Sequence, residues 1–90
     1  MPFVYIVRCV DGTLYTGWAI EVAARVQVHN AGRGAKYTKT RRPVKLIYSE
    51  ELPTRAEAMK REMAIKRLPR ARKLALAASS VRPRPKRRAG

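Results

Sequence analysis

The stretch VYIVRCVDGTLYTG, residues 4–17, decides how this chain begins to fold, because it joins two strand-like runs by an Asp-Gly pair. β-Branched and aromatic residues fill both runs, and Asp11-Gly12 is a strong turn signal. The pattern therefore predicts a β-hairpin with strands at residues 3–10 and 13–18.

The loop of this hairpin determines whether Tyr5 and Tyr15 lie on one face of the sheet. A two-residue loop would put them on opposite faces, because side chains alternate along a strand. A type I turn with Gly12 in the left-handed bulge position instead pairs Val7 with Tyr15, and the two tyrosines become diagonal neighbours about 7–8 Å apart. We predict the bulged loop. Composition by itself also fits two half-buried strand tyrosines with no chemical role.

Charge is the most unusual property of the chain, with 21 Lys and Arg against 6 Asp and Glu in 90 residues and a formal net charge of +15. Such an excess favours a polyanionic partner, most commonly nucleic acid, although an anionic membrane surface or a ribosome fits the same charge. Cys9 is the sole cysteine, which excludes an intrachain disulfide and a Cys-rich zinc site. No run has the length of a membrane-spanning helix. We expect a cytoplasmic protein, with the nucleoid as one location, that acts on no membrane; its oligomeric state stays open.

Periodicity places the remaining elements. Residues 21–30 predict a helix that stops at Gly32, and residues 44–50 predict a third strand. The sequence TRAE at 54–57 is a capping box that opens a helix running to about Leu68, and a shorter helix follows over 70–78. The element order is thus ββαβαα in one domain, residues 1–78. The basic, proline-containing tail, residues 79–90, is expected to be disordered.

Glu62 falls among apolar residues of the helix over 54–68. On a helical wheel the apolar side is defined by Ala58, Met59, Met63 and Ile65. A carboxylate on a core-facing stripe is costly unless it is paired or bound to a metal. Two interpretations stay open: a structural salt bridge to an arginine, or a ligand for a divalent cation such as Mg²⁺, which needs few carboxylates.

The first helix carries a further pair, Arg25 and His29, four residues apart on one face. Arginine can fork onto a phosphate, and histidine can relay a proton. A surface arginine and a structural histidine would fit the same pattern.

Taken together, VYI at 4–6, YTG at 15–17, Arg25 with HN at 29–30, and Glu62 in KREMAIKRL resemble the GIY-YIG nuclease family, and more closely its small stand-alone bacterial members. The resemblance implies an α+β fold in which helices flank a three-stranded antiparallel sheet. It also implies a metal-dependent active site that hydrolyses phosphodiester bonds.

The same resemblance implies a role for each matched residue. Tyr5 and Tyr15 match tyrosines that activate water and position the scissile phosphate, and Arg25 matches an arginine that stabilises the phosphate. His29 stands where the family has a His or Tyr near the reacting groups. Glu62 matches the single glutamate that binds a divalent cation, Mg²⁺ or Mn²⁺. We expect the positive chain to favour the phenolate of whichever tyrosine acts as base.

Three departures from the family pattern are visible. The glycine that precedes the tyrosine of the first motif is absent, and Trp18 stands where some family nucleases carry a lysine. The asparagine that some members have after the metal-binding glutamate is also missing. These departures bear on how efficiently the site would cleave.

The basic loop over residues 32–43 is expected to contact nucleic acid, since it contains no acidic residue. The candidate contacts are Lys36, Tyr37, Thr38, Lys39, Arg41 and Arg42. The leading hypothesis is a metal-dependent endonuclease that acts on DNA rather than RNA, structure-selective or non-specific. The alternatives are a catalytically weak or inactive nucleic-acid-binding module on the same scaffold, and a protein that docks to an acidic partner or the ribosome.

Overall fold

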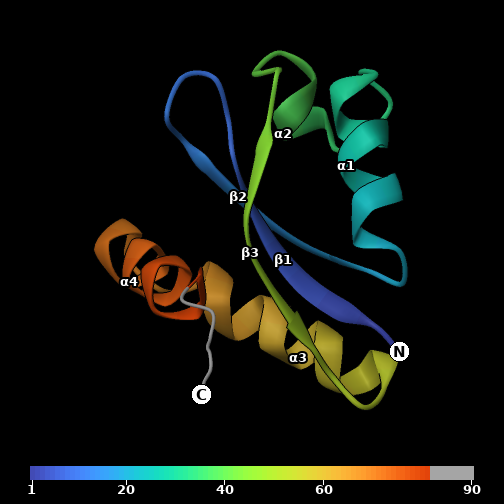
Figure 1. The fold of residues 1–90 in the computed structure, drawn as a ribbon, viewed down its shortest axis with the longest axis vertical. Coiled ribbons are helices and arrows are strands. Elements are labelled where there is room, and N and C mark those ends of the chain that lie inside the picture. The colour runs from blue at the N-terminus through green and yellow to red at the C-terminus, as the bar shows by residue number, and fades with distance from the viewer. Residues whose placement is uncertain (82–90) are drawn as a thin grey trace, which may run out of the picture.

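The computed structural model describes residues 1–81 and confirms the α+β class, with three antiparallel strands and flanking helices (Figure 1). Its elements are β1 (Phe3–Arg8), β2 (Leu14–Ala19), α1 (Val22–Asn30), α2 (Lys36–Lys39), β3 (Lys45–Glu51), α3 (Arg55–Lys66) and α4 (Arg70–Val81). Two details differ from the sequence prediction. The basic loop contains the one-turn helix α2, and α4 continues through Val81, into the segment predicted to be disordered. The rest of that predicted tail lies outside the described residues.

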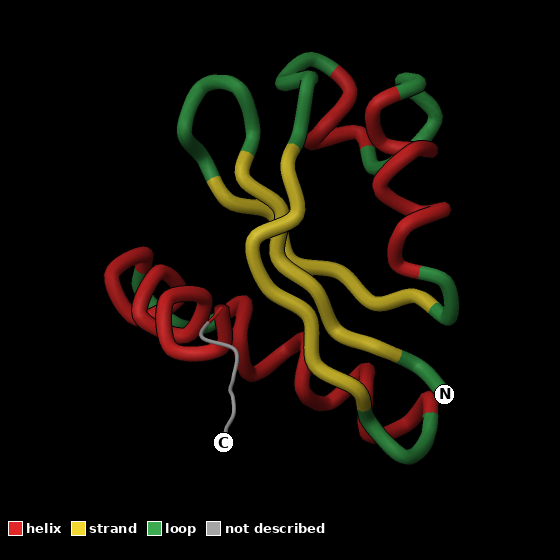
Figure 2. The backbone as a smooth tube through the Cα atoms, viewed as in Figure 1, coloured by secondary structure: helices red, strands yellow, loops and turns green. Residues whose placement is uncertain are grey.

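Strand β1 forms the centre of the sheet, between β2 and β3 (Figure 2). At the hairpin, the Gly12 N–H donates to the Cys9 carbonyl at 2.9 Å, and the Cys9 N–H donates to the Thr13 carbonyl at 2.8 Å. Gly12 has a φ of +85°, a left-handed conformation that glycine adopts without steric cost. Val7 consequently lies opposite Tyr15, which confirms the predicted bulged loop.

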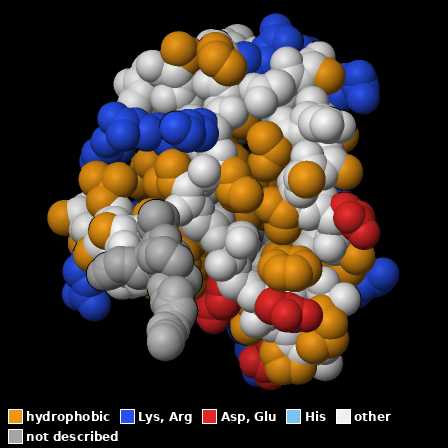
Figure 3. All heavy atoms as spheres, viewed as in Figure 1, with side chains coloured by type: hydrophobic (Ala, Val, Ile, Leu, Met, Phe, Trp, Pro, Cys, Tyr) orange, Lys and Arg blue, Asp and Glu red, His pale blue; other side chains and the backbone are white. Residues whose placement is uncertain are grey.

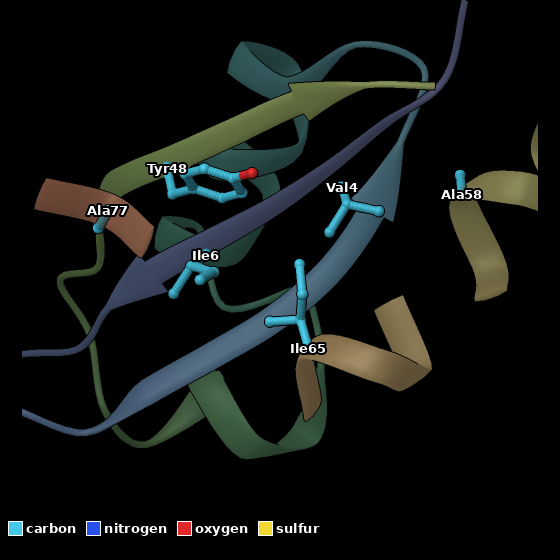
Figure 4. Packing of buried hydrophobic residues seen from close by; sticks show 6 residues of the cluster. All are labelled: Val4, Ile6, Tyr48, Ala58, Ile65 and Ala77. Carbon is cyan, nitrogen blue, oxygen red and sulfur yellow. The ribbon is translucent and has the colours of Figure 1, made fainter. Parts of the chain in front are cut away.

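The two faces of the sheet have different partners. Val4 and Ile6 point toward α3 and α4, where they form the larger core (Figure 4). This core consists of Val4, Ile6, Tyr48, Ala58, Ile65 and Ala77. Tyr5 and Val7 lie on the opposite face, against the side chains of α1. Because the residues of β1 alternate between faces, Tyr5 lies on the α1 side of the sheet although its neighbours Val4 and Ile6 lie in the larger core.

Helix α3 corrects one sequence interpretation. Met59 and Met63, expected on the apolar side, are 51% and 55% exposed, whereas Ala58 and Ile65 are fully buried. Seven residues make almost two complete turns, so Ala58 and Ile65 align along the face that meets the sheet, and the two methionines lie farther around the helix. Glu62, one turn after Ala58, borders the buried stripe.

Local signals at the helix ends behave as the sequence predicts. The Thr54 hydroxyl accepts a hydrogen bond from the Glu57 N–H at 3.1 Å and caps α3. Helix α1 ends in a Schellman motif, with the Gly32 N–H bonded to the His29 carbonyl and the Arg33 N–H to the Val28 carbonyl. These two ends fix where the chain leaves α1 and enters α3.

On the face shown in Figure 3, Lys and Arg lie mainly along the upper and left margins, and Asp and Glu lie in the lower and right parts, where some basic side chains are also visible. Tyr48 and Arg61 both donate to the Glu50 carboxylate, at 2.6 and 2.9 Å, so one acidic residue joins β3 to α3.

Within residues 1–81, no helix combines the length and the apolar character that crossing a membrane requires.

Candidate active site

An open pocket of about 560 Å³ lies between the tyrosine-bearing face of the hairpin, α1, the loop after α1, and α3. Its lining includes all five residues predicted to act in catalysis: Tyr5, Tyr15, Arg25, His29 and Glu62. These residues come from four elements and span most of the described chain, so the tertiary fold brings them together. The five predicted residues therefore line one common pocket.

Tyr5 and His29 form the buried part of this pocket. The Tyr5 hydroxyl lies 2.8 Å from His29 Nε2, and the other ring nitrogen, Nδ1, lies 2.8 Å from the Thr38 hydroxyl. Tyr5, His29 and Thr38 are 2%, 1% and 0% exposed. The three side chains therefore make a hydrogen-bonded row that reaches from β1 through α1 to α2.

Burial shifts both titratable groups of this row toward their neutral forms. The pKa of Tyr5 is raised above its ordinary value, chiefly by burial, with Tyr15 and Glu62 adding to the effect and Arg25 opposing it. The pKa of His29 is lowered from 6.5, first by burial and then by the positive charge of Arg25. The expectation that the basic chain would favour a phenolate is therefore wrong for Tyr5, because desolvation outweighs the nearby cation.

Tyr15 is held by rings on two sides. It meets His29 edge to face, with ring centroids 5.3 Å apart, and stacks on Tyr37 at 5.9 Å with an interplanar angle of 24°. Arg41 in turn places its guanidinium carbon 4.1 Å from the centroid of the Tyr37 ring. Tyr37, a predicted contact for nucleic acid, is thus already in contact with Tyr15 and with Arg41.

Glu62 projects into the pocket and has a lysine as its ion-pair partner, with Lys66 Nζ 3.5 Å from Oε2 one turn later on α3. The arginine partner that the sequence left open is not observed among the described residues. Residues 1–81 also contain no cluster of three His, Cys, Asp or Glu side chains that would enclose a metal ion. A single carboxylate in an open, arginine-lined pocket fits Mg²⁺ or Mn²⁺, which takes its other ligands from water and phosphate.

Two arginines of the pocket, Arg33 and Arg55, were not found from the sequence. The place of Arg55 near Glu62 is predictable from the sequence, because Arg55 precedes Glu62 by seven residues, almost two helical turns, and so lies on the same face of α3. Arg33 gave no signal, since its place depends on the path of the chain after α1. Together with Arg25 they make the pocket a site for anionic groups.

The basic loop separates into surface and structural residues. Lys36, Tyr37, Lys39 and Arg42 are exposed, as a contact with nucleic acid requires. Arg41 is half-buried and forms an ion pair with Asp11 at 3.2 Å, which ties α2 to the hairpin. The assignment of Thr38 to the nucleic-acid surface is wrong, because Thr38 is fully buried behind His29.

Small residues and one amide complete the site. A Cβ at Gly17 would lie 2.6 Å from the Tyr5 hydroxyl, and a Cβ at Gly34 would collide with the His29 ring. Asn30 bonds both backbone groups of Val44, accepting from its N–H at 2.6 Å and donating to its carbonyl at 3.1 Å. The side chain after His29 therefore anchors the end of α1 beside the start of β3.

Comparison with known proteins agrees with this arrangement. The family model of the GIY-YIG catalytic domain matches residues 1–75, and the chain belongs to this nuclease-type family. Among its relatives, a UPF0213 protein of Staphylococcus aureus strain Mu3 is 61% identical over 74 residues, which cover 82% of this chain and 90% of the relative.

Two solved structures share the fold. The solution NMR structure of a UPF0213 protein from Bacillus halodurans has a TM-score of 0.58 and 39% identity, covering 92% of this chain and 89% of its own. The solution NMR structure of a protein from E. faecalis has a TM-score of 0.57 and 37% identity, covering 93% of this chain and 91% of its own. The family expected from the sequence motifs is confirmed, and the matched region covers most of each of these relatives.

Proposed function

We propose that this protein is a metal-dependent endonuclease that hydrolyses phosphodiester bonds in DNA. The observation that carries the proposal is the convergence of Tyr5, Tyr15, Arg25, His29 and Glu62 on one pocket. Membership of the GIY-YIG family supports nuclease chemistry at this position. The net charge of +15 and the pocket arginines support an anionic polymer as the substrate.

The Tyr5–His29 pair supplies a route for the proton of the attacking water. As the water oxygen bonds to phosphorus, its proton passes to the Tyr5 oxygen while the Tyr5 proton passes to His29 Nε2, 2.8 Å away. The P–O bond to the leaving oxygen breaks, and that oxygen takes a proton from solvent. Tyr5 thus remains a neutral phenol before and after the step, consistent with its raised pKa.

Arg25 and Glu62 deal with the charge of the phosphate. Arg25 lines the same pocket and offers a fork of N–H donors to the non-bridging oxygens. Glu62 would hold Mg²⁺ or Mn²⁺, and such an ion, when bound, supplies charge stabilisation to the phosphate and to the leaving oxygen. Lys66, the exposed partner of Glu62, also places its Nζ 5.7 Å from the centroid of the Tyr15 ring, so a further cation lies beside these two site residues.

The test compares wild type with Glu62→Gln on labelled single strands, duplex, nicked and branched DNA, and structured RNA, in Mg²⁺, in Mn²⁺ and in EDTA. Glu57→Gln is the matched control, because Glu57 is an exposed glutamate in the first turn of the same helix. We expect metal-dependent cleavage by wild type and Glu57→Gln. Glu62→Gln should lose at least about 10²-fold in rate while it binds as tightly as wild type, since the change removes negative charge.

Two results would contradict the proposal. Equal cutting by all three proteins, with or without EDTA, would point to a contaminating nuclease. Tight, salt-sensitive binding with no cutting of any substrate would favour the alternative of a binding module on the same scaffold. One observation supports that alternative: Trp18, which replaces the lysine of some family nucleases, lines the pocket.

A further inference from the structure

Thr38 lies directly behind His29, on the side of the imidazole away from Tyr5. We propose that Thr38 is a positioning residue that determines which nitrogen of His29 carries the proton and thereby makes Nε2 the acceptor for Tyr5. The inference rests on the proposed function, because only a proton-accepting Nε2 serves the hydrolysis step. It assigns to Thr38 a task different from the nucleic-acid contact that the sequence suggested.

The contacts of the Thr38 hydroxyl favour one direction for the hydrogen bonds of the row over the reverse direction, which would run from Thr38 through the imidazole to Tyr5. The Thr38 hydroxyl donates its single proton to the Ala35 carbonyl at 3.0 Å, so toward His29 Nδ1, 2.8 Å away, it acts as an acceptor. Nδ1 must then carry the hydrogen, and in a neutral imidazole Nε2 is left with a lone pair. The Tyr5 hydroxyl accordingly donates to Nε2. All donors of the row point from β1 toward α2.

A group of the protein must stabilise the Nδ1–H tautomer of His29, because an imidazole in water favours the opposite tautomer, with its hydrogen on Nε2. A His29 in that form would donate to Tyr5 and have no lone pair there to take a proton. Both ring nitrogens already have a protein partner, Tyr5 at Nε2 and Thr38 at Nδ1, and His29 and Thr38 are 1% and 0% exposed, so water does not replace either partner. The choice of tautomer therefore falls to the Thr38 hydroxyl.

The backbone holds Thr38 in place for this task. The Ala35 carbonyl also accepts the N–H groups of Thr38 and Lys39, both at 3.1 Å, which closes the single turn of α2 around it. Gly34 lies against the His29 ring with no room for a Cβ. The segment 34–39 thus packs closely against the imidazole of His29, with Thr38 facing the ring and the basic residues facing solvent.

The first experiment needs no variant, because the chain contains a single histidine. Long-range ¹H–¹⁵N correlation spectra of histidine-labelled protein, recorded above the pKa of His29, identify the protonated ring nitrogen directly. We expect the hydrogen on Nδ1, with a nuclear Overhauser effect to the Thr38 methyl group. A hydrogen on Nε2 in wild type would overturn the inference.

The second experiment compares Thr38→Val, which keeps the shape and removes the acceptor, with Thr38→Ser, which keeps the hydroxyl. We expect Thr38→Val to populate the Nε2–H tautomer and to lose about 10²-fold in cleavage rate, the lower end of the range for acid–base groups. Thr38→Ser should keep the wild-type tautomer and most of the rate. If Thr38→Val fails to fold, Thr38→Cys, with a weak acceptor of similar size, replaces it in the same measurements.

The outcomes separate this inference from the proposed function. An unchanged tautomer in the folded variant lacking the acceptor overturns the role of Thr38, whatever the cleavage rate. The expected tautomer shift together with a wild type that cuts no substrate supports control of His29 by Thr38 and overturns the nuclease proposal. A tautomer shift with a parallel loss of cleavage supports both.

Discussion

Gly17→Ala should disturb the site by the addition of one methyl group. A Cβ at Gly17 would lie 2.6 Å from the Tyr5 hydroxyl oxygen and 2.8 Å from the ring carbon that bears it. Ordinary van der Waals contact begins near 3.4 Å, so the hydroxyl must move by about 0.8 Å. Catalytic groups tolerate displacements of about 0.5 Å, so the shift is enough to disrupt the bond from Tyr5 to His29.

The size of the effect follows from the packing. Overpacking a buried site costs about 1–3 kcal/mol, and weakening a buried hydrogen bond costs about 1 kcal/mol. Part of this cost, about 0.5–1 kcal/mol, is offset because alanine has fewer conformations than glycine in the unfolded chain. We expect the free energy of unfolding to fall by about 2 kcal/mol, which lowers Tm by roughly 8–16 °C in a domain of this size.

Gly12→Ala is the matched control on the same hairpin. Nothing lies within 4 Å of a Cβ at Gly12, but its φ of +85° makes alanine strained by about 1–2 kcal/mol. Both variants should therefore lose similar stability in urea denaturation. Only Gly17→Ala should shift the His29 ring resonances and lower the cleavage rate, by about 10²-fold. Wild-type stability and unchanged His29 resonances in Gly17→Ala would refute the reasoning.

The further predictions concern pH, the larger core and the tail. Because the pKa of His29 is lowered below 6.5 in the folded protein, the unfolded chain binds this proton at a higher pH than the folded protein does. The free energy of unfolding, measured by urea denaturation at several pH values, should therefore decrease as the pH falls from 6.5 to the pKa of folded His29. The cleavage rate should rise with pH through that same lowered pKa, since only neutral His29 accepts a proton; a flat rate profile would argue against the relay. Tyr48→Phe should cost about 0.5–1.5 kcal/mol, measured by thermal unfolding, and leave cleavage unchanged, because Tyr48 lies on the sheet face away from the pocket. Deletion of residues 82–90, which contain five basic residues, should lower both the affinity for DNA and the slope of log affinity against log salt, while the cleavage rate at saturating substrate stays the same.

The sequence by itself determined the order of the main elements and the partners within the hairpin. Asp11-Gly12, the capping box that begins at Thr54 and the stop at Gly32 act over a few residues, so their outcome is encoded locally. Strand alternation and the bulged loop were sufficient to put Tyr5 and Tyr15 on one face. Each of the five candidate catalytic residues stands in a short motif, so the sequence predicts all of them.

The tertiary structure decided everything that depends on distance between elements. Thr38 looked like a surface contact in a basic loop, and only the packing of α2 against α1 turns it inward onto His29. Met59 and Met63 looked like core, and the direction in which α3 meets the sheet leaves them exposed. The pKa of Tyr5 depends on burial, which composition does not reveal, and burial outweighs a net charge spread over the whole surface. Local motifs specify which residues are the candidates for the site; close packing specifies how deeply each of them is buried and which groups it contacts.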